Sequence, residues 1–301
     1  MKVRVGYGLG TQAPTDPESL AGLIDELERL RFDSLWLSER LTGPAPDPVV
    51  GLAFAAARTT RLKFGTSVMV LPGRNPVVLA KELATLDRLS GGRLLPAFGL
   101  GVRDPAEQQA FGVERGERAK WFDEVLPLLR RLWSEDAVDH DGPRFSYRGL
   151  TVRPKPAQES MDVWLGGQSD VELRRCGRLG DGWLPSFCLP PDVAAGIPVI
   201  EAAAAEAGRS VDPEHYGVLV AYLPPGIDPG ITEQFAARVA ARRPGTDPVA
   251  LLPAGHDAVR ARLEGFIDVG ASKFVLVPVA EPPSWADELG ALAESVLPLE
   301  T

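Results

Sequence analysis

The chain has 301 residues, of which 45% are hydrophobic and 24% are charged, and this composition is ordinary for a globular protein. Its 32 basic and 41 acidic residues give a formal net charge of −9 at pH 7, and no run of lysine or arginine stands against this acidic balance. We therefore expect neither nucleic acid nor a membrane as a partner, because no basic patch is evident and no apolar run approaches the ~20 residues that span a bilayer.

Runs typical of β-strands alternate with amphipathic helical patterns from the first residues onward. A strand is predicted over 3–9, and Asp16-Pro17 then begins a helix, because aspartate caps free amide groups and proline suits the first helical position. From Leu20 to Leu30 the apolar residues recur at spacings of three and four, which gives this helix one apolar face. The first half continues with strands at 34–37, within 62–76 and at 93–102, and with helices at 47–57, 75–89 and 118–133.

The second half repeats the alternation, and eight strands each followed by a helix predict an α/β fold, a single (β/α)₈ TIM barrel over 1–301. A doubly wound sheet is less favoured, because its glycine-rich first turn needs a GxGxxG spacing that GYGLGTQAP lacks. The predicted strands are 162–167, 182–187, 216–223 and 273–279, and the helices are 169–179, 194–207, 257–269 and one from Ser284 to about 297. Inserted loops, rather than separate domains, are expected at 103–117 after strand four, at 134–160 in the region of strand five and at 224–255 after strand seven.

The amino terminus and the cysteines bear on location and metal binding. The sequence MKVRVGYGLG enters an apolar strand directly, without the apolar core of a signal peptide, which favours the cytoplasm. Cys176 and Cys188 cannot build a disulfide framework, and the three histidines do not stand near them at the spacing of a zinc site. We therefore expect no metal.

In a barrel of this kind the active site lies at the carboxyl ends of the strands. The residues predicted there include no pair of acids and no nucleophile beside a base, as a hydrolase would usually show. Small residues on several strand ends instead indicate a wide cavity for a large planar ligand, although a glycine can also simply end a strand. The small residues are Gly8, Gly10, Ser67, Val68, Gly99, Gly101, Gly166 and Gly167.

Two strand ends add polar groups. Strand five runs into Gly166-Gly167-Gln168 and a capping serine, so its turn presents free N–H groups at a helix start and predicts an anion site. An ordinary strand–turn–helix junction would have the same residues. Strand two ends in Glu39-Arg40, a carboxylate beside a guanidinium that could bind the polar edge of a ring or form a solvated ion pair.

Several stretches together resemble the luciferase-like monooxygenase superfamily, the bacterial-luciferase type of barrel that includes flavin- and coenzyme F420-dependent oxidoreductases. The F420-dependent branch is the most similar, because GTSV followed by a proline-bearing loop and NP is typical of it. The stretches are FDSLWLSER (32–40), RLKFGTSVMVLPGRNPVVLAKELATLDRLSGGRL (61–94), FGLGV (98–102), GERAKWFDEVLPLLRRLW (116–133) and VWLGGQSDVELRRCGRLGDGWLPS (163–186).

The resemblance implies a cis peptide bond between Ser67 and Val68, behind the central ring of the deazaflavin. It also implies that Gly166-Gly167-Gln168 binds the cofactor's phosphate, and that Glu39 matches an acidic position at the ring's polar edge in sugar-phosphate-oxidising relatives. Where those relatives have a histidine and a glutamate as acid/base groups, this chain has Arg40 and Val102. We therefore do not expect sugar-phosphate oxidation.

The function expected from this resemblance is hydride transfer between C5 of F420 and an unidentified small organic substrate, with Glu39 and Arg40 as catalytic side chains and a possible homodimer. Arg103, Arg115 and Arg118 are candidates for binding the cofactor's polyglutamate tail. Two alternatives stay open. FMN could use the same phosphate turn in an FMN-dependent monooxygenase, and a non-catalytic flavin- or F420-binding protein would be consistent with Val102.

Overall fold

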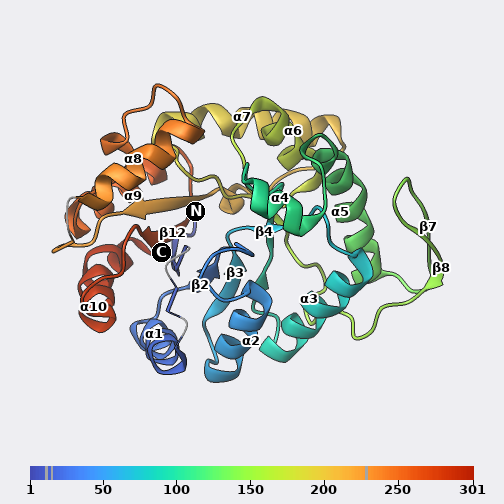
Figure 1. The fold of residues 1–301 in the computed structure, drawn as a ribbon, viewed down its shortest axis with the longest axis horizontal. Helices are drawn as coiled ribbons and strands as arrows, with labels where there is room; N and C mark the ends of the chain where they lie inside the picture. Colours follow the sequence, from blue (N-terminus) through green and yellow to red (C-terminus); the bar gives the residue numbers. More distant parts are fainter. Residues whose placement is uncertain (11–12, 15, 228–229) are drawn as a thin grey trace.

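Strands and helices alternate along the chain and form a ring, with the strands inside and the helices outside (Figure 1). The structure is a computed structural model that describes residues 1–10, 13–14, 16–227 and 230–301. Residues 11, 12 and 15, which follow the predicted first strand, and 228 and 229, in the third predicted insertion, therefore lie outside the described residues.

The parallel strands occupy eight positions, and positions three and four are each divided in two. Hydrogen bonds join them into a six-stranded sheet of order β11-β12-β1-β2-β3-β5 and a four-stranded sheet of order β10-β9-β6-β4. Isolated bridges, Trp183 to Tyr216 and Ser186 to Leu219, link the β10 and β11 regions. The bounds are β1 Arg4–Gly8, β2 Ser34–Leu37, β3 Lys63–Thr66, β4 Met69–Val70, β5 Leu94–Leu95, β6 Ala97–Gly99, β9 Trp164–Leu165, β10 Gly182–Trp183, β11 Gly217–Tyr222 and β12 Lys273–Pro278. The predicted barrel fold is confirmed, although its hydrogen-bonded ladder is not continuous around the ring.

The helices begin where their capping residues predict. Asp16 accepts a hydrogen bond from the Ser19 N–H, and Asn75 accepts from Val77 and Val78, so free amide groups of the first turn are satisfied. The helix predicted at 194 begins earlier, at Pro190, because prolines fit a first turn and Asp192 caps the Leu189 N–H. The helices of the ring are α1 Pro17–Leu30, α2 Pro48–Arg58, α3 Pro76–Ser90, α5 Arg118–Ser134, α6 Asp170–Leu179, α7 Pro190–Glu206, α9 His256–Asp268 and α10 Trp285–Val296.

The three predicted insertions are present, and each contains regular structure that the sequence pattern did not predict. The first holds α4 (Pro105–Phe111), which Asp104 caps. The second forms an antiparallel hairpin of β7 (Val138–Asp141) and β8 (Ser146–Leu150), which extends away from α5 in Figure 1. The third holds α8 (Gly230–Arg242). Short 3₁₀ turns occur at Arg115–Glu117, Pro213–His215, Val249–Leu251 and Leu297–Leu299.

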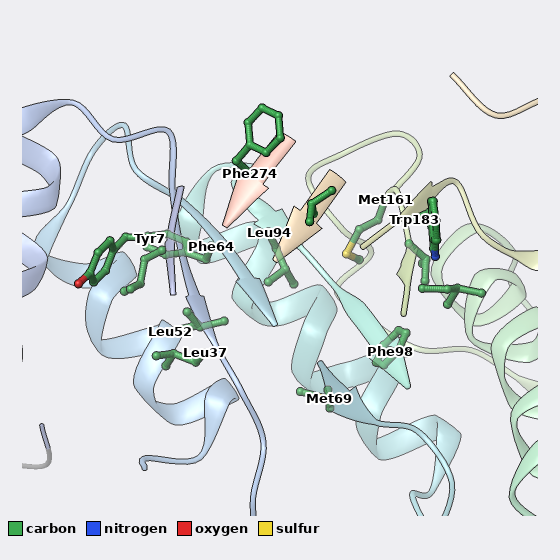
Figure 2. Close-up of a cluster of buried hydrophobic side chains, with 14 of the residues drawn as sticks. Tyr7, Leu37, Leu52, Phe64, Met69, Leu94, Phe98, Met161, Trp183 and Phe274 are labelled. Atoms are coloured by element: carbon green, nitrogen blue, oxygen red, sulfur yellow. The ribbon is translucent and has the colours of Figure 1, made fainter. Parts of the chain in front are cut away.

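Buried side chains form one large cluster and two smaller ones. The large cluster takes residues from β1 through α10, and Figure 2 shows part of it, including Leu37 of β2, Leu52 of α2 and Phe98 of β6. A second cluster, with Trp36, Trp164 and Val275, has its members on the strands and their immediate continuations. The single domain predicted over 1–301 is consistent with this arrangement and stays a prediction.

Two features are absent from the described residues. Among the residues placed by the structure, no helix combines the length and the hydropathy needed to cross a bilayer. Within the same residues, no group of three or more histidine, cysteine, aspartate and glutamate side chains could hold a metal ion.

Candidate functional site

The carboxyl ends of strand positions two to five lie together and bring several predicted site residues to one place. The Ser67 N–H donates to the Leu37 carbonyl at 2.8 Å, and the Gly166 N–H donates to the Phe98 carbonyl at 3.3 Å. Side chains and glycines of three strands then meet around Val68, which is half-buried. We call Val68, Gly99 and Gly166 the strand-end wall.

The Ser67–Val68 peptide bond is cis, so the geometry implied by the family resemblance is confirmed. It lies in the gap between β3 and β4, and the end of β2 holds it. The Ser38 hydroxyl donates to the Ser67 carbonyl at 2.9 Å, and the Glu39 N–H donates to the Val68 carbonyl at 3.3 Å. Strand two therefore fixes both residues of this peptide through direct hydrogen bonds.

The glycines predicted to bind the cofactor lie against different neighbours in the structure. A Cβ atom at Gly99 would lie 2.6 Å from Val68 Cγ2, so glycine is needed there for the packing of Val68 itself. At Gly166 the nearest atoms to such a Cβ lie 3.6 Å away, an ordinary contact, which leaves room beside this residue. Gly101 lies against Val70 instead, and Gly167 lies against the side chain of Glu172.

Glu39 is held by Arg74 and not by its neighbour Arg40. Its side chain is only 1% exposed, and one carboxylate oxygen accepts from the Val70 N–H at 2.7 Å while the other pairs with the Arg74 guanidinium. Burial raises the pKa of the Glu39 carboxyl, and the Arg74 charge and the Val70 N–H offset part of this shift. The solvated Glu39–Arg40 ion pair considered from the sequence is therefore not formed.

Arg40 interacts with the first insertion. Its guanidinium lies 3.8 Å from the Asp104 carboxylate, and its side chain is 28% exposed. The same insertion is fastened to the loop after β2 by Glu107, which accepts from the Thr42 N–H at 2.9 Å, from the Thr42 hydroxyl at 2.6 Å and from the Leu41 N–H at 3.3 Å. Helix α4 thus covers the region into which Arg40 extends.

The predicted anion site has the expected donors, but a carboxylate of the chain already occupies them. The N–H groups of Gln168 and Ser169 both donate to Glu172 Oε2, at 3.1 Å and 3.0 Å, and the Ser169 hydroxyl donates to the same oxygen at 2.8 Å. This arrangement is a capping box at the start of α6. A phosphate can use these donors only after Glu172 leaves them.

Sequence reasoning missed two arginines at the site. Arg74 pairs with Glu39, and Arg243, just after α8, lies 3.3 Å from Gln168 Oε1 while it donates to the Phe187 carbonyl and to Asp192. Arg74 lies within the 61–94 stretch that carries the family resemblance, but nothing in that stretch marks its pairing with Glu39, and Arg243 lies outside the resembling stretches. Arg118, expected to face the cofactor's tail, is buried and donates to the Leu100 and Val102 carbonyls, so it is not available for that role.

The strand-end wall suits the face of a planar ring. Val68 presents an apolar surface, Gly166 leaves space beside it, and the nearby carboxylate of Glu39 is neutralised by Arg74. The turn at Gln168 supplies two N–H groups for a phosphate once Glu172 is displaced. These residues therefore fit a phosphorylated ring cofactor, with Glu172 as the group that must move.

The sequence matches a known family over most of its length. A model of the luciferase-like monooxygenase family matches residues 2–225. An F420-dependent glucose-6-phosphate dehydrogenase of Kineococcus radiotolerans is 32% identical over 178 residues, which cover 56% of this chain and 52% of that protein. The matched region thus spans about half the length of the curated relatives.

Two solved structures share the fold. An F420-dependent secondary alcohol dehydrogenase, in complex with an F420–acetone adduct, superposes with a TM-score of 0.85 at 19% identity over all of both chains. The oxygenating constituent of 3,6-diketocamphane monooxygenase from Pseudomonas putida, in complex with FMN, superposes with a TM-score of 0.78 at 17% identity and covers 100% of this chain and 99% of that one. At these identities the likeness concerns the fold alone.

Proposed function

Because the chain belongs to the luciferase-like monooxygenase family, we propose that it is an oxidoreductase that transfers a hydride between coenzyme F420 and a small organic substrate. The observation that carries the proposal is the strand-end wall, where Val68, Gly99 and Gly166 meet beside the Ser67–Val68 peptide. A relative named as F420-dependent, at 32% identity, supports this cofactor. When bound, F420 supplies the hydride-carrying carbon C5.

The chain's own residues would bind and orient this cofactor. Ser67, Val68, Gly99 and Gly166 are proposed to contact the ring. Gly167 and Gln168 are proposed to hold the phosphate through the turn before α6. Gly101 contributes indirectly, because it packs against Val70.

Glu39 and Arg40 are the polar side chains of the proposed catalytic region. The two differ in access, since the Arg40 side chain is 28% exposed and that of Glu39 is 1% exposed. Arg40 is therefore the proposed partner for negative charge that develops on the ring or the substrate. With Val102 where sugar-phosphate-oxidising relatives have an acid, we propose a substrate other than a sugar phosphate.

An FMN-dependent monooxygenase is the second candidate, supported by the FMN-containing structure that shares the fold. A non-catalytic flavin- or F420-binding protein is the third. A cytoplasmic location is proposed from the sequence, and a homodimer is supported by exposed apolar side chains on α2 and at the start of α3, which are Val50, Phe54 and Val78.

The function is tested by mixing purified protein with reduced F420 and a panel of activated enones, nitroaromatics and ketones, while the reappearance of the oxidised deazaflavin absorbance is followed. The proposal expects protein-dependent oxidation with at least one compound, and glucose 6-phosphate with oxidised F420 is expected to give none. Turnover with reduced FMN and oxygen but none with F420 would establish the second candidate. Binding of F420 without turnover of any compound would favour the third.

A further inference from the structure

Arg74 and Glu39 together hold the backbone of one residue, Val70, behind the strand-end wall. Arg74 lies in the segment between β4 and α3 and its side chain is 21% exposed, whereas that of Glu39 is 1% exposed. Glu39 Oε2 accepts from the Val70 N–H at 2.7 Å, and Arg74 Nε donates to the Val70 carbonyl at 2.9 Å. The two side chains also pair with each other, so they form a closed set of contacts around Val70.

The same part of the chain is held from both neighbouring strands. The end of β2 contacts Ser67 and Val68 through the Ser38 hydroxyl and the Glu39 N–H, at 2.9 Å and 3.3 Å. On the other side, the Leu71 N–H donates to the Gly99 carbonyl at 3.2 Å. The backbone from 67 to 71 is thus fixed at several points, and Glu39 supplies two of them, one through its N–H and one through its carboxylate.

The Glu39 carboxylate and two nitrogens of the Arg74 guanidinium are committed to structural contacts. Each carboxylate oxygen of Glu39 already has a partner, and Arg74 uses Nε for the Val70 carbonyl and Nη2 for Glu39. A proton donor or acceptor must reach the reacting atoms within hydrogen-bond distance, and a carboxylate that is 1% exposed and fully engaged does not meet this condition. These contacts instead agree with a role for Glu39 and Arg74 in positioning the backbone at Val70.

We propose that Arg74 and Glu39 are positioning residues, which hold Val70 and thereby keep Val68 in the place where the cofactor ring packs, and that neither group exchanges a proton with the substrate. This inference rests on the proposed function, because the ring is assigned to the wall there. It assigns a task to Arg74, which was not among the predicted site residues, and it changes the role expected for Glu39.

The test compares four variants: Arg74→Met, Glu39→Gln, the double variant Glu39→Gln/Arg74→Met, and Arg58→Met as a control. Arg58 is a suitable control because it forms a surface ion pair with Asp25, away from the wall. For each variant the Kd for F420 is measured by fluorescence titration, and the circular dichroism of the bound deazaflavin reports how the ring is held. Thermal midpoints show whether each variant is folded.

The expected result is a rise of about tenfold or more in Kd for Arg74→Met, together with a changed dichroism of the bound ring. Glu39→Gln should have a smaller effect, because its amide oxygen still accepts from the Val70 N–H. The double variant should bind no more weakly than Arg74→Met, because it does not leave an unpaired carboxylate buried. The control should bind as the unmodified protein does.

Two outcomes would overturn the inference. One is unchanged affinity and dichroism in both Arg74→Met and Glu39→Gln. The other is a Glu39→Gln variant that binds F420 normally but loses turnover, which would make Glu39 an acid or base. If the unmodified protein binds no F420, the proposed function fails, and the positioning claim is then decided by amide exchange over 67–71. Arg74→Met must accelerate this exchange, and unchanged exchange would refute the claim.

Discussion

Gly99 and Gly166 both face Val68, yet an added methyl group would meet different surroundings at the two positions. At Gly99 it would lie 2.6 Å from Val68 Cγ2, and at Gly166 no atom comes nearer than 3.6 Å. A Gly99→Ala change must therefore displace Val68, whereas Gly166→Ala fills space that the proposed ring would use. The two substitutions separate the stability of the wall from its function.

We predict that Gly99→Ala lowers the free energy of unfolding by about 1–3 kcal/mol, as overpacking does, and weakens F420 binding as well. Gly166→Ala should change stability by less than about 0.5 kcal/mol but raise the Kd for F420 by about tenfold. Urea unfolding and fluorescence titration measure the two effects. If Gly166→Ala binds F420 normally, the ring does not lie beside Gly166.

A second prediction at the residue scale concerns Glu172 and the binding of the cofactor's phosphate. Its carboxylate occupies the N–H groups of Gln168 and Ser169, where the cofactor's phosphate is proposed to bind. Glu172→Ala should tighten F420 binding several-fold, because phosphate no longer competes with a carboxylate, and should cost about 1 kcal/mol of stability through loss of the cap.

The matched control for this prediction is Asp170→Ala, which also removes a negative charge from the first turn of α6. Asp170 contacts Arg174 and not the N–H groups of Gln168 and Ser169. Equal tightening in both variants would point to general electrostatics. Weaker binding in Glu172→Ala would show that the cofactor needs this carboxylate, contrary to our account.

Sequence reasoning found the residues whose position follows from a pattern and missed those that depend on contacts across the fold. Ser67 and Val68 stand in a stretch that resembles a known family, and the cis peptide that this resemblance implies is present. Arg74 stands in the same stretch, two residues before the start of α3, but the stretch does not show what its side chain contacts. Its pairing with Glu39, 35 positions away, arises only when β2 and β4 are brought together.

Among the helices and strands, several with a local sequence signal at their start were predicted, while others were missed. Helices that begin with an acceptor followed by proline, as at Asp16, Asp47 and Asn75, were predicted correctly, because caps act within one turn. Helix α8 and the β7–β8 hairpin were missed, because proline and glycine in their segments suggested loops. Tertiary contacts help to hold α8 in place, such as the stacking of Phe235 on Phe187 with ring centres 5.8 Å apart.

Arg243 connects the end of α8 with the region around Gln168, and this connection can be tested. It donates to the Phe187 carbonyl at 2.9 Å and to Asp192 at 2.7 Å. Since hydrogen bonds of charged groups contribute about 1.5–3 kcal/mol, Arg243→Met should accelerate amide exchange in α8 and over 187–192 by roughly tenfold or more.

Hydrogen exchange followed by mass spectrometry measures this effect. Arg238→Met is the control, because Arg238 is an exposed residue of the same helix. The connection would be refuted by equal exchange in the two variants.

For the whole molecule, a buried ion pair joins the amino ends of the strands. Lys273 at the start of β12 donates to Asp33 just before β2, with Nζ and Oδ2 2.5 Å apart, and Lys63 approaches the other oxygen at 3.4 Å. Burial opposes ionisation of Asp33, but the two lysine charges outweigh it, so its pKa falls from 3.8 to about 2. Burial lowers the pKa of Lys273, and its pairing with Asp33 offsets part of that shift.

The sign of the resulting pH dependence follows from the lowered pKa. Asp33 contributes its full stabilisation above pH 3.8 and loses it as the pH falls toward about 2, a loss of roughly 2 kcal/mol. Urea unfolding at several pH values should show that the double variant Asp33→Asn/Lys273→Met lacks this part of the acid sensitivity. An identical acid dependence in both proteins would contradict the assignment.

The overall barrel followed from the number and order of the predicted strands and helices, while the substrate did not follow from either sequence or fold. The resemblance places Arg40 and Val102 where sugar-phosphate-oxidising relatives have acid/base groups, and on that ground we propose a substrate other than a sugar phosphate. The cofactor is the part of the account that a single experiment can decide.

That experiment is a side-by-side fluorescence titration of the purified protein with F420 and with FMN at the same pH and ionic strength. The account predicts saturable binding of F420 and an FMN Kd at least about tenfold higher. Tight binding of FMN with no detectable binding of F420 would contradict it.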